Sequence, residues 1–201
     1  MIARVLVDLL FPPLCVTCGN RLRNSQLCDV CWEASRIVDP AYRCIHCFAS
    51  SETSLCGQCS ENPVMPYPRA VVFEREAPIL HLIDEESVEA VAGFAFVALQ
   101  QLGWPEPDFL VSVIPSPISN ALAVLCNKVS PNFFQRRFFL GRPEKWELRE
   151  GLIPEDAIIV LFDPGCKPKE LENACAAISE AFPKKVYILS LYIPKLAQES
   201  V

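Results

Sequence analysis

The sequence lacks an uninterrupted apolar run of the roughly 18 to 20 residues that cross a bilayer. Its apolar first stretch, MIARVLVDLLFPPLC, is interrupted by Asp8 and lacks the small-residue cleavage site of a secretory signal. We therefore expect residues 2–10 to form a short docking helix in a soluble, cytoplasmic protein. A membrane anchor or an uncleaved signal is the alternative for this segment.

Positive charge is also scarce. The chain has 18 lysines and arginines against 24 aspartates and glutamates, which gives a formal net charge of −6. Neutralisation of phosphates supplies most of the general affinity for nucleic acid. The composition therefore excludes a generally basic nucleic-acid-binding surface, and any such contact must be local.

Cysteine, in contrast, is abundant at one end of the chain. Eight of the eleven cysteines form four C-x2-C pairs: Cys15 and Cys18, Cys28 and Cys31, Cys44 and Cys47, Cys56 and Cys59. Two residues between sulfurs let one tight turn aim both thiolates at one ion, and two such turns complete the tetrahedral shell of Zn2+. We therefore expect two Zn2+ on these eight cysteines.

The spacing of the pairs indicates a duplicated unit, because nine residues separate the first two pairs and eight separate the last two. Consecutive pairs that share an ion would make two sequential ribbons, which the hairpin-length inserts favour. Alternate pairs that interleave in a cross-brace remain an alternative, as does a disulfide framework. His46 lies inside the third pair and is expected to be a bystander, since cysteines already fill both shells.

The 201 residues, 51% hydrophobic and 21% charged, suffice for one medium domain plus a small one. Residues 61–68, ENPVMPYP, contain three prolines without periodicity and predict a boundary, with a Cys-rich domain at 1–66 and a second domain at 67–201. We expect loss of a zinc ligand such as Cys15 to loosen the first domain and to leave the second folded.

Beyond the boundary the pattern is α/β. Helical spacing of apolar residues predicts helices at 86–102 and from Leu171 to Phe182. Short apolar runs at 109–114, 157–162 and 185–191 predict interior strands. Strand, helix and strand within about 35 residues form a βαβ unit, so we expect a parallel sheet.

This order of parts resembles the ComF family of competence-associated proteins. The resemblance is carried by LLFPPLCVTCGN, LCDVCW, CIHC and CGQC, then by VVFEREAPILHLI, VSVIPSP and AIIVLFDPGCKPKELENACAAISEAFPKKVYILSLY. It implies zinc knuckles followed by a type I phosphoribosyltransferase-like α/β domain at 67–201. It also implies a role in DNA uptake or processing, with protein partners of that machinery and single-stranded DNA as a possible ligand.

The loop in AIIVLFDPGCKPKELE departs from the family pattern. The resemblance implies two acids and a Thr-Thr-Gly core that bind phosphoribosyl pyrophosphate, but Phe162 takes the first acidic position. Asp163, Gly165 and Lys167 are what remains, and Pro168 has no N–H to donate. We therefore expect a degenerate site without transferase activity, which takes Mg2+ only if the loop still binds its ligand.

Residues 132–149, NFFQRRFFLGRPEKWELR, form a run that is rich in both basic and aromatic residues. Aromatic platforms beside cations suit single-stranded nucleic acid, which makes Arg136, Arg137 and Arg142 candidate contacts. The alternative is a hairpin with one buried aromatic face and one solvated basic face.

Three functions therefore remain open. The first is a non-catalytic ComF-like protein that assists DNA uptake or processing through its zinc ribbons and α/β domain. The second is a phosphoribosyltransferase-class enzyme that uses Asp163 in an altered loop. The third is a zinc adaptor in some other assembly.

Overall fold

The structure is a computed structural model that describes residues 13–22, 26–82, 87–128, 134–137, 145–149 and 153–193. The predicted docking helix at residues 2–10 and the candidate contact Arg142 lie outside these residues. Among the helices in the described parts of the chain, none is long and apolar enough to cross a membrane.

Four parallel strands form the central sheet. In spatial order they are β1 (Arg69–Val71), β6 (Lys185–Ser190), β5 (Ile158–Asp163) and β2 (Phe109–Ser112). The two middle strands, KVYILS and IIVLFD, are rich in apolar residues because both of their faces are covered. The predicted parallel α/β domain is thus confirmed.

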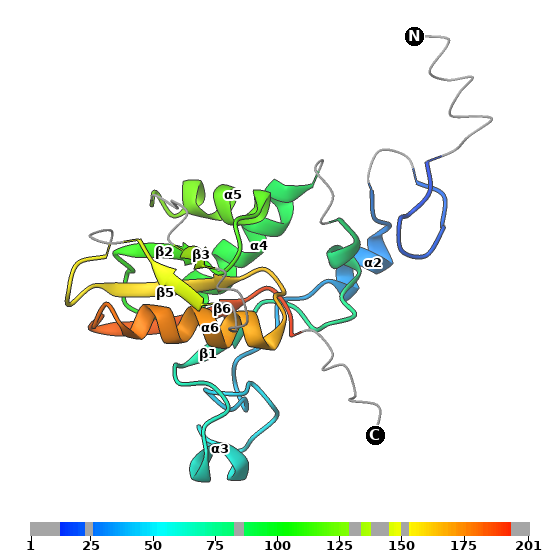
Figure 1. The fold of residues 1–201 in the computed structure, drawn as a ribbon. Helices are drawn as coiled ribbons and strands as arrows, with labels where there is room; N and C mark the ends of the chain where they lie inside the picture. The colour runs from blue at the N-terminus through cyan, green and yellow to red at the C-terminus, as the bar shows by residue number, and fades with distance from the viewer. Residues whose placement is uncertain are drawn as a thin grey trace, which may run out of the picture.

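Helices cover both faces of this sheet (Figure 1). α4 (Val88–Gln101) and α5 (Pro117–Leu125) lie on one face, and α6 (Pro168–Ser179) lies on the other. Successive residues of β5 point to opposite faces. Phe162 accordingly joins the core under α4 and α5, while Leu161 joins the core under α6.

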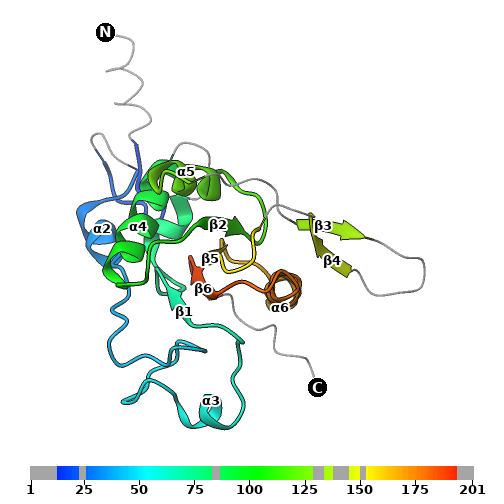
Figure 2. The ribbon, with the colours of Figure 1, turned by 90° about the vertical axis from the view of Figure 1, so that its left-hand side faces the viewer.

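The basic, aromatic run contains an antiparallel hairpin of β3 (Phe134–Arg137) and β4 (Lys145–Leu148). Phe134 and Trp146 are buried, with ring centroids 5.5 Å apart, and they belong to the core under α6. Figure 2 shows the hairpin extending beyond α6. Two aromatic residues of the run therefore pack inward and are not platforms for bases.

The cysteine-rich part forms two small units that occupy different positions relative to the sheet. The first ends in α2 (Asp29–Ala34), which lies near α4 and the 3-10 helix η1 (Pro78–Leu82). The second ends in α3 (Gly57–Glu61) and extends away from the sheet beyond β1 (Figure 2).

The first unit shares the core of the α/β domain. Leu27 is fully buried in the same cluster as Phe73 and Ile79. The ring of Trp32 stacks on that of Phe94 at 6.0 Å. We infer that the first unit contributes to the folding of the α/β domain, which the sequence alone does not indicate.

Candidate metal centres and the loop after strand β5

The structure brings consecutive cysteine pairs together. The sulfurs of Cys15, Cys18, Cys28 and Cys31 lie within 4.8 Å of one another, and so do those of Cys44, Cys47, Cys56 and Cys59. Four thiolates at such distances fit the tetrahedral shell of structural Zn2+. The arrangement of two sequential ribbons is therefore confirmed, and the donors support two Zn2+ ions.

Backbone geometry repeats between the two ribbons. Gly19 N–H donates to the Cys15 carbonyl at 2.9 Å, and Phe48 N–H donates to the Cys44 carbonyl at the same distance. Both donors have left-handed backbones, with φ of 72° for Gly19 and 62° for Phe48. Glycine adopts this conformation freely, whereas the phenylalanine needs compensation. Burial of the Phe48 ring in the core supplies it.

The first cysteine of each quartet is prepared for metal binding by nearby amides. Burial raises the pKa of the Cys15 thiol, but N–H groups of Cys18, Cys28 and Thr17 lower it to about 6 overall. Burial likewise raises the pKa of the Cys44 thiol, but the N–H groups of Cys47, Cys56 and His46 lower it to about 6 overall. Because Zn2+ binds thiolates, these amides favour the state that the metal requires.

His46 has a separate role from the cysteines around it. Its Nδ1 lies 2.7 Å from the Met65 carbonyl, within hydrogen-bonding distance. That contact links the second ribbon to the chain leading into β1. It agrees with the expectation that His46 is not a ligand.

The loop after β5 is organised around the buried carboxylate of Asp163. This residue is 0% exposed. Its Oδ2 accepts hydrogen bonds from Arg69 Nη2 at 3.2 Å and from Ser190 Oγ at 2.9 Å. Arg69 Nε donates to Ser190 Oγ at 2.9 Å and completes a three-residue network. Asp163 is therefore neutralised inside the protein and does not fit a Mg2+ ligand.

Asp163 also accepts hydrogen bonds from the backbone amides that a phosphate would need. Its Oδ1 accepts from Gly165 N–H at 2.9 Å and from Cys166 N–H at 2.7 Å. Lys167 N–H donates to Glu170 Oε2 at 3.1 Å. Pro168 has no N–H. The first four positions after Pro164 thus offer no free backbone N–H for an anion at the start of α6.

The ring of Tyr192 packs closely against Gly165 in the loop after β5. Gly165 has φ of 106°, and a Cβ built on it would lie 2.4 Å from the Tyr192 ring. Only glycine fits both the backbone conformation and this close approach. Of the three predicted loop residues, Asp163 and Gly165 are joined by a hydrogen bond. Lys167 is exposed and lies outside the hydrogen-bond network of Asp163.

The sequence analysis did not identify Arg69 and Ser190, whose side chains donate hydrogen bonds to Asp163. Burial lowers the pKa of Arg69 below its ordinary value, and the charge of Asp163 opposes that shift. A polar residue at the end of a buried strand, such as Ser190 in KVYILS, is a weak signal for such a network. Arg69 gives no local signal, because it lies 94 positions from Asp163.

Residues 6–60 match the family model of the double zinc ribbon domain. Among solved structures, the chain is similar to a purine phosphoribosyltransferase from Pyrococcus horikoshii Ot3. The sequence identity is 12% and the TM-score is 0.44, over 63% of this chain and 86% of that chain. No curated protein matches the sequence. The chain thus contains a double zinc ribbon followed by a parallel-sheet α/β domain.

Removal of one zinc ligand should have different effects in the two ribbons. We expect Cys15→Ser and Cys44→Ser each to hold one Zn2+ per chain instead of two. Cys15 lies in the core of the α/β domain and Cys44 does not, so Cys15→Ser should also lower the unfolding temperature of the α/β domain more strongly. Metal quantification and thermal unfolding followed by circular dichroism test this. Equal losses of stability would contradict it.

The buried ion pair should also be important for stability. Arg69→Met leaves the Asp163 carboxylate buried without its cation, which should lower the free energy of unfolding by about 3 to 5 kcal/mol. Arg75→Met at an exposed arginine is the matched control and should change it by less than about 0.5 kcal/mol. Denaturant unfolding measures both. A loss below about 1 kcal/mol in Arg69→Met would show that the pair contributes little.

Proposed function

We propose that the chain is a non-catalytic, ComF-like adaptor that assists DNA uptake or processing in the cytoplasm. The double zinc ribbon and the parallel α/β domain support this architecture. The cellular process rests on the resemblance of the sequence motifs to that family. On this proposal, the α/β domain positions the ribbons and makes contacts, and it does not transfer a phosphoribosyl group.

The single observation that carries the proposal is the inward orientation of Asp163. A phosphoribosyl-binding loop needs carboxylates that face the ligand and amides that surround its phosphate. Here the carboxylate accepts hydrogen bonds from Arg69, Ser190 and two amides of its own loop. Ligand binding would have to break this buried network and would leave Arg69 without its counter-charge.

The first ribbon supports a role in protein contacts. Leu14, Val16 and Val30 are 53%, 53% and 72% exposed and all flank cysteines of the first quartet. We infer that these side chains contribute to a contact surface, since contiguous exposed apolar patches mark such surfaces. In an adaptor, Zn2+ would hold these side chains in a fixed arrangement.

Phosphoribosyl pyrophosphate with Mg2+ should leave the unfolding temperature unchanged. A ligand at 100 times its dissociation constant adds about 2.7 kcal/mol to the stability of the folded state, which a thermal shift detects. We expect no shift, because the loop donors and Asp163 are already paired. A clear shift that disappears in Asp163→Asn would overturn the proposal and favour a phosphoribosyltransferase-class enzyme.

Single-stranded DNA is the nucleic acid partner that this proposal includes. If the hairpin of β3 and β4 contacts it, replacing Arg136 and Arg137 with glutamine should weaken binding and reduce the salt slope by about 1 for each lost phosphate contact. Fluorescence anisotropy of a labelled oligonucleotide at several salt concentrations measures this. Unchanged affinity would remove the hairpin from the interface.

A further inference from the structure

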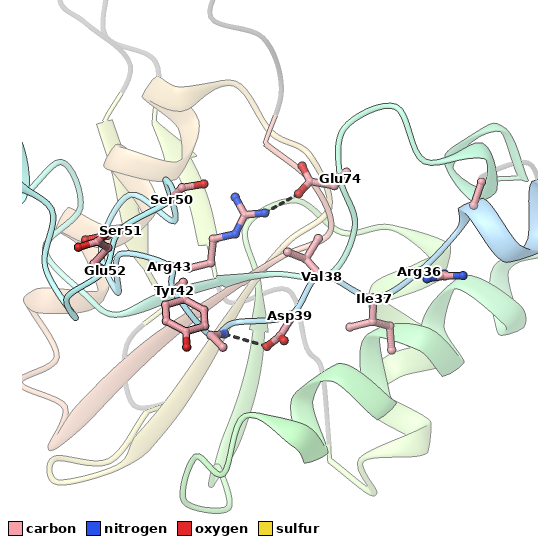
Figure 3. Close-up of a pocket in the computed structure, with 12 residues that line it drawn as sticks. Arg36, Ile37, Val38, Asp39, Tyr42, Arg43, Ser50, Ser51, Glu52 and Glu74 are labelled. Carbon is pink, nitrogen blue, oxygen red and sulfur yellow. Dashed lines mark hydrogen bonds and ion pairs between the residues drawn. The ribbon is translucent and has the colours of Figure 1, made fainter.

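A hollow of about 720 Å³ lies between the two ribbons. It is lined by residues 36–39, which link the ribbons, by the hairpin of the second ribbon, and by Glu74 (Figure 3). It is distinct from both metal centres and from the loop after β5. Its volume falls in the range of sites that hold a small ligand or a short peptide segment.

One wall of the hollow is a short extended segment that runs beside the residues after β1. Ile37 pairs antiparallel with Phe73, and Val38 N–H donates to the Val72 carbonyl at 2.9 Å. Residues 37 and 38 therefore lie beside residues 72 and 73, which follow β1, through one isolated bridge. In an antiparallel pair the backbone groups of successive residues point to opposite sides. The N–H and C=O of Ile37 consequently point outward, where an extended peptide can pair with them.

The other end of the hollow carries an aromatic ring and two carboxylates. Tyr42 is 78% exposed, and it lines the hollow together with Asp39 and Glu52 (Figure 3). Hydrogen bonds hold the backbone at this end: Ala41 N–H donates to Asp39 Oδ1 at 2.8 Å, and Ser51 N–H donates to the Tyr42 carbonyl at 2.8 Å.

Outside the ion pairs of the described residues, the lining has two carboxylates, Asp39 and Glu52, and one guanidinium, Arg36, so its net charge is negative. Among the described residues, neither Asp39 nor Glu52 takes part in an ion pair. The nearby cation Arg43 is already paired with Glu74 at 2.7 Å. The remaining cation, Arg36, donates from Nε to the Glu33 carbonyl at 3.1 Å. A guanidinium or ammonium group is the complement of an aromatic face with nearby carboxylates.

We propose that this hollow binds an extended, positively charged segment of a partner protein. The main chain of the segment pairs with Ile37, and an arginine or lysine side chain lies over Tyr42 near Asp39 and Glu52. The carboxylates repel a phosphate backbone, so the site takes protein and not nucleic acid. This inference specifies the kind of partner that the proposed adaptor binds. It rests on the proposed function only for the cellular process in which the partner acts.

The test uses the full zinc-loaded chain and a fluorescein-labelled nonapeptide of alternating valine and arginine. We expect saturable binding by fluorescence anisotropy that weakens with salt, and no binding of the matched valine–glutamate peptide. Tyr42→Ala should weaken binding about fivefold through loss of the cation–π contact. The double variant Asp39→Asn, Glu52→Gln should weaken it about tenfold through loss of charge-assisted hydrogen bonds.

Phe182→Ala is the matched control. Phe182 is 76% exposed with φ of 48°, compared with 78% and 58° for Tyr42, but it lies outside the hollow. Its replacement, like Glu180→Gln, should leave the affinity within twofold of the original. Zinc content and unfolding temperature show whether each variant is folded. If Tyr42→Ala loses zinc, the affinity of the double variant for the arginine peptide is the test of binding in the hollow.

The proposal is overturned if the arginine peptide does not bind saturably, or if it binds equally to the chain and to both hollow variants. Direct binding of a labelled oligothymidine that weakens in Tyr42→Ala would also overturn it, since the site would then take nucleic acid. None of these outcomes depends on phosphoribosyl pyrophosphate. A failed peptide test therefore stays distinguishable from a failure of the non-catalytic function.

Discussion

The ion pair between Arg69 and Asp163 joins parts of the chain that are otherwise far apart. Through its side chain, Arg69 contacts Ser190 at the end of β6 and Asp163 at the end of β5. Through its N–H it donates to the Ile45 carbonyl of the second ribbon at 2.6 Å. Since a buried charge is tolerated only with its partner, these elements must be assembled together. The loop after β5 takes its closed form from this requirement.

The two ribbons have the same local design but different surroundings. Both use left-handed residues after the second cysteine, and both begin a short helix after the third. The first ribbon gives Cys15, Leu27 and Cys31 to the core of the α/β domain. The second extends outward and forms one side of the hollow. The first ribbon is thus the one more deeply joined to the core, whereas the second contacts the core through Phe48 and shapes an accessible surface.

Local features of the sequence predicted most of the architecture. The C-x2-C spacing identified both zinc quartets because their geometry is set within about 17 residues of chain. Apolar runs such as IIVLFD identified the parallel strands because both faces are buried. The departures at Phe162 and Pro168 indicated an altered loop. The pairing of Asp163 with Arg69 was not predictable, because it joins residues 94 positions apart. Packing of Leu27 against the second domain was missed for the same reason.

Hydrogen exchange of the Gly165 and Cys166 amides tests the closed loop most directly, because both N–H groups donate to the buried carboxylate of Asp163. The account predicts that they exchange about as slowly as amides of the central strand β5, and that phosphoribosyl pyrophosphate with Mg2+ leaves their rates unchanged. Exchange near the rate of an unprotected amide, or slower exchange on addition of the ligand, would contradict it.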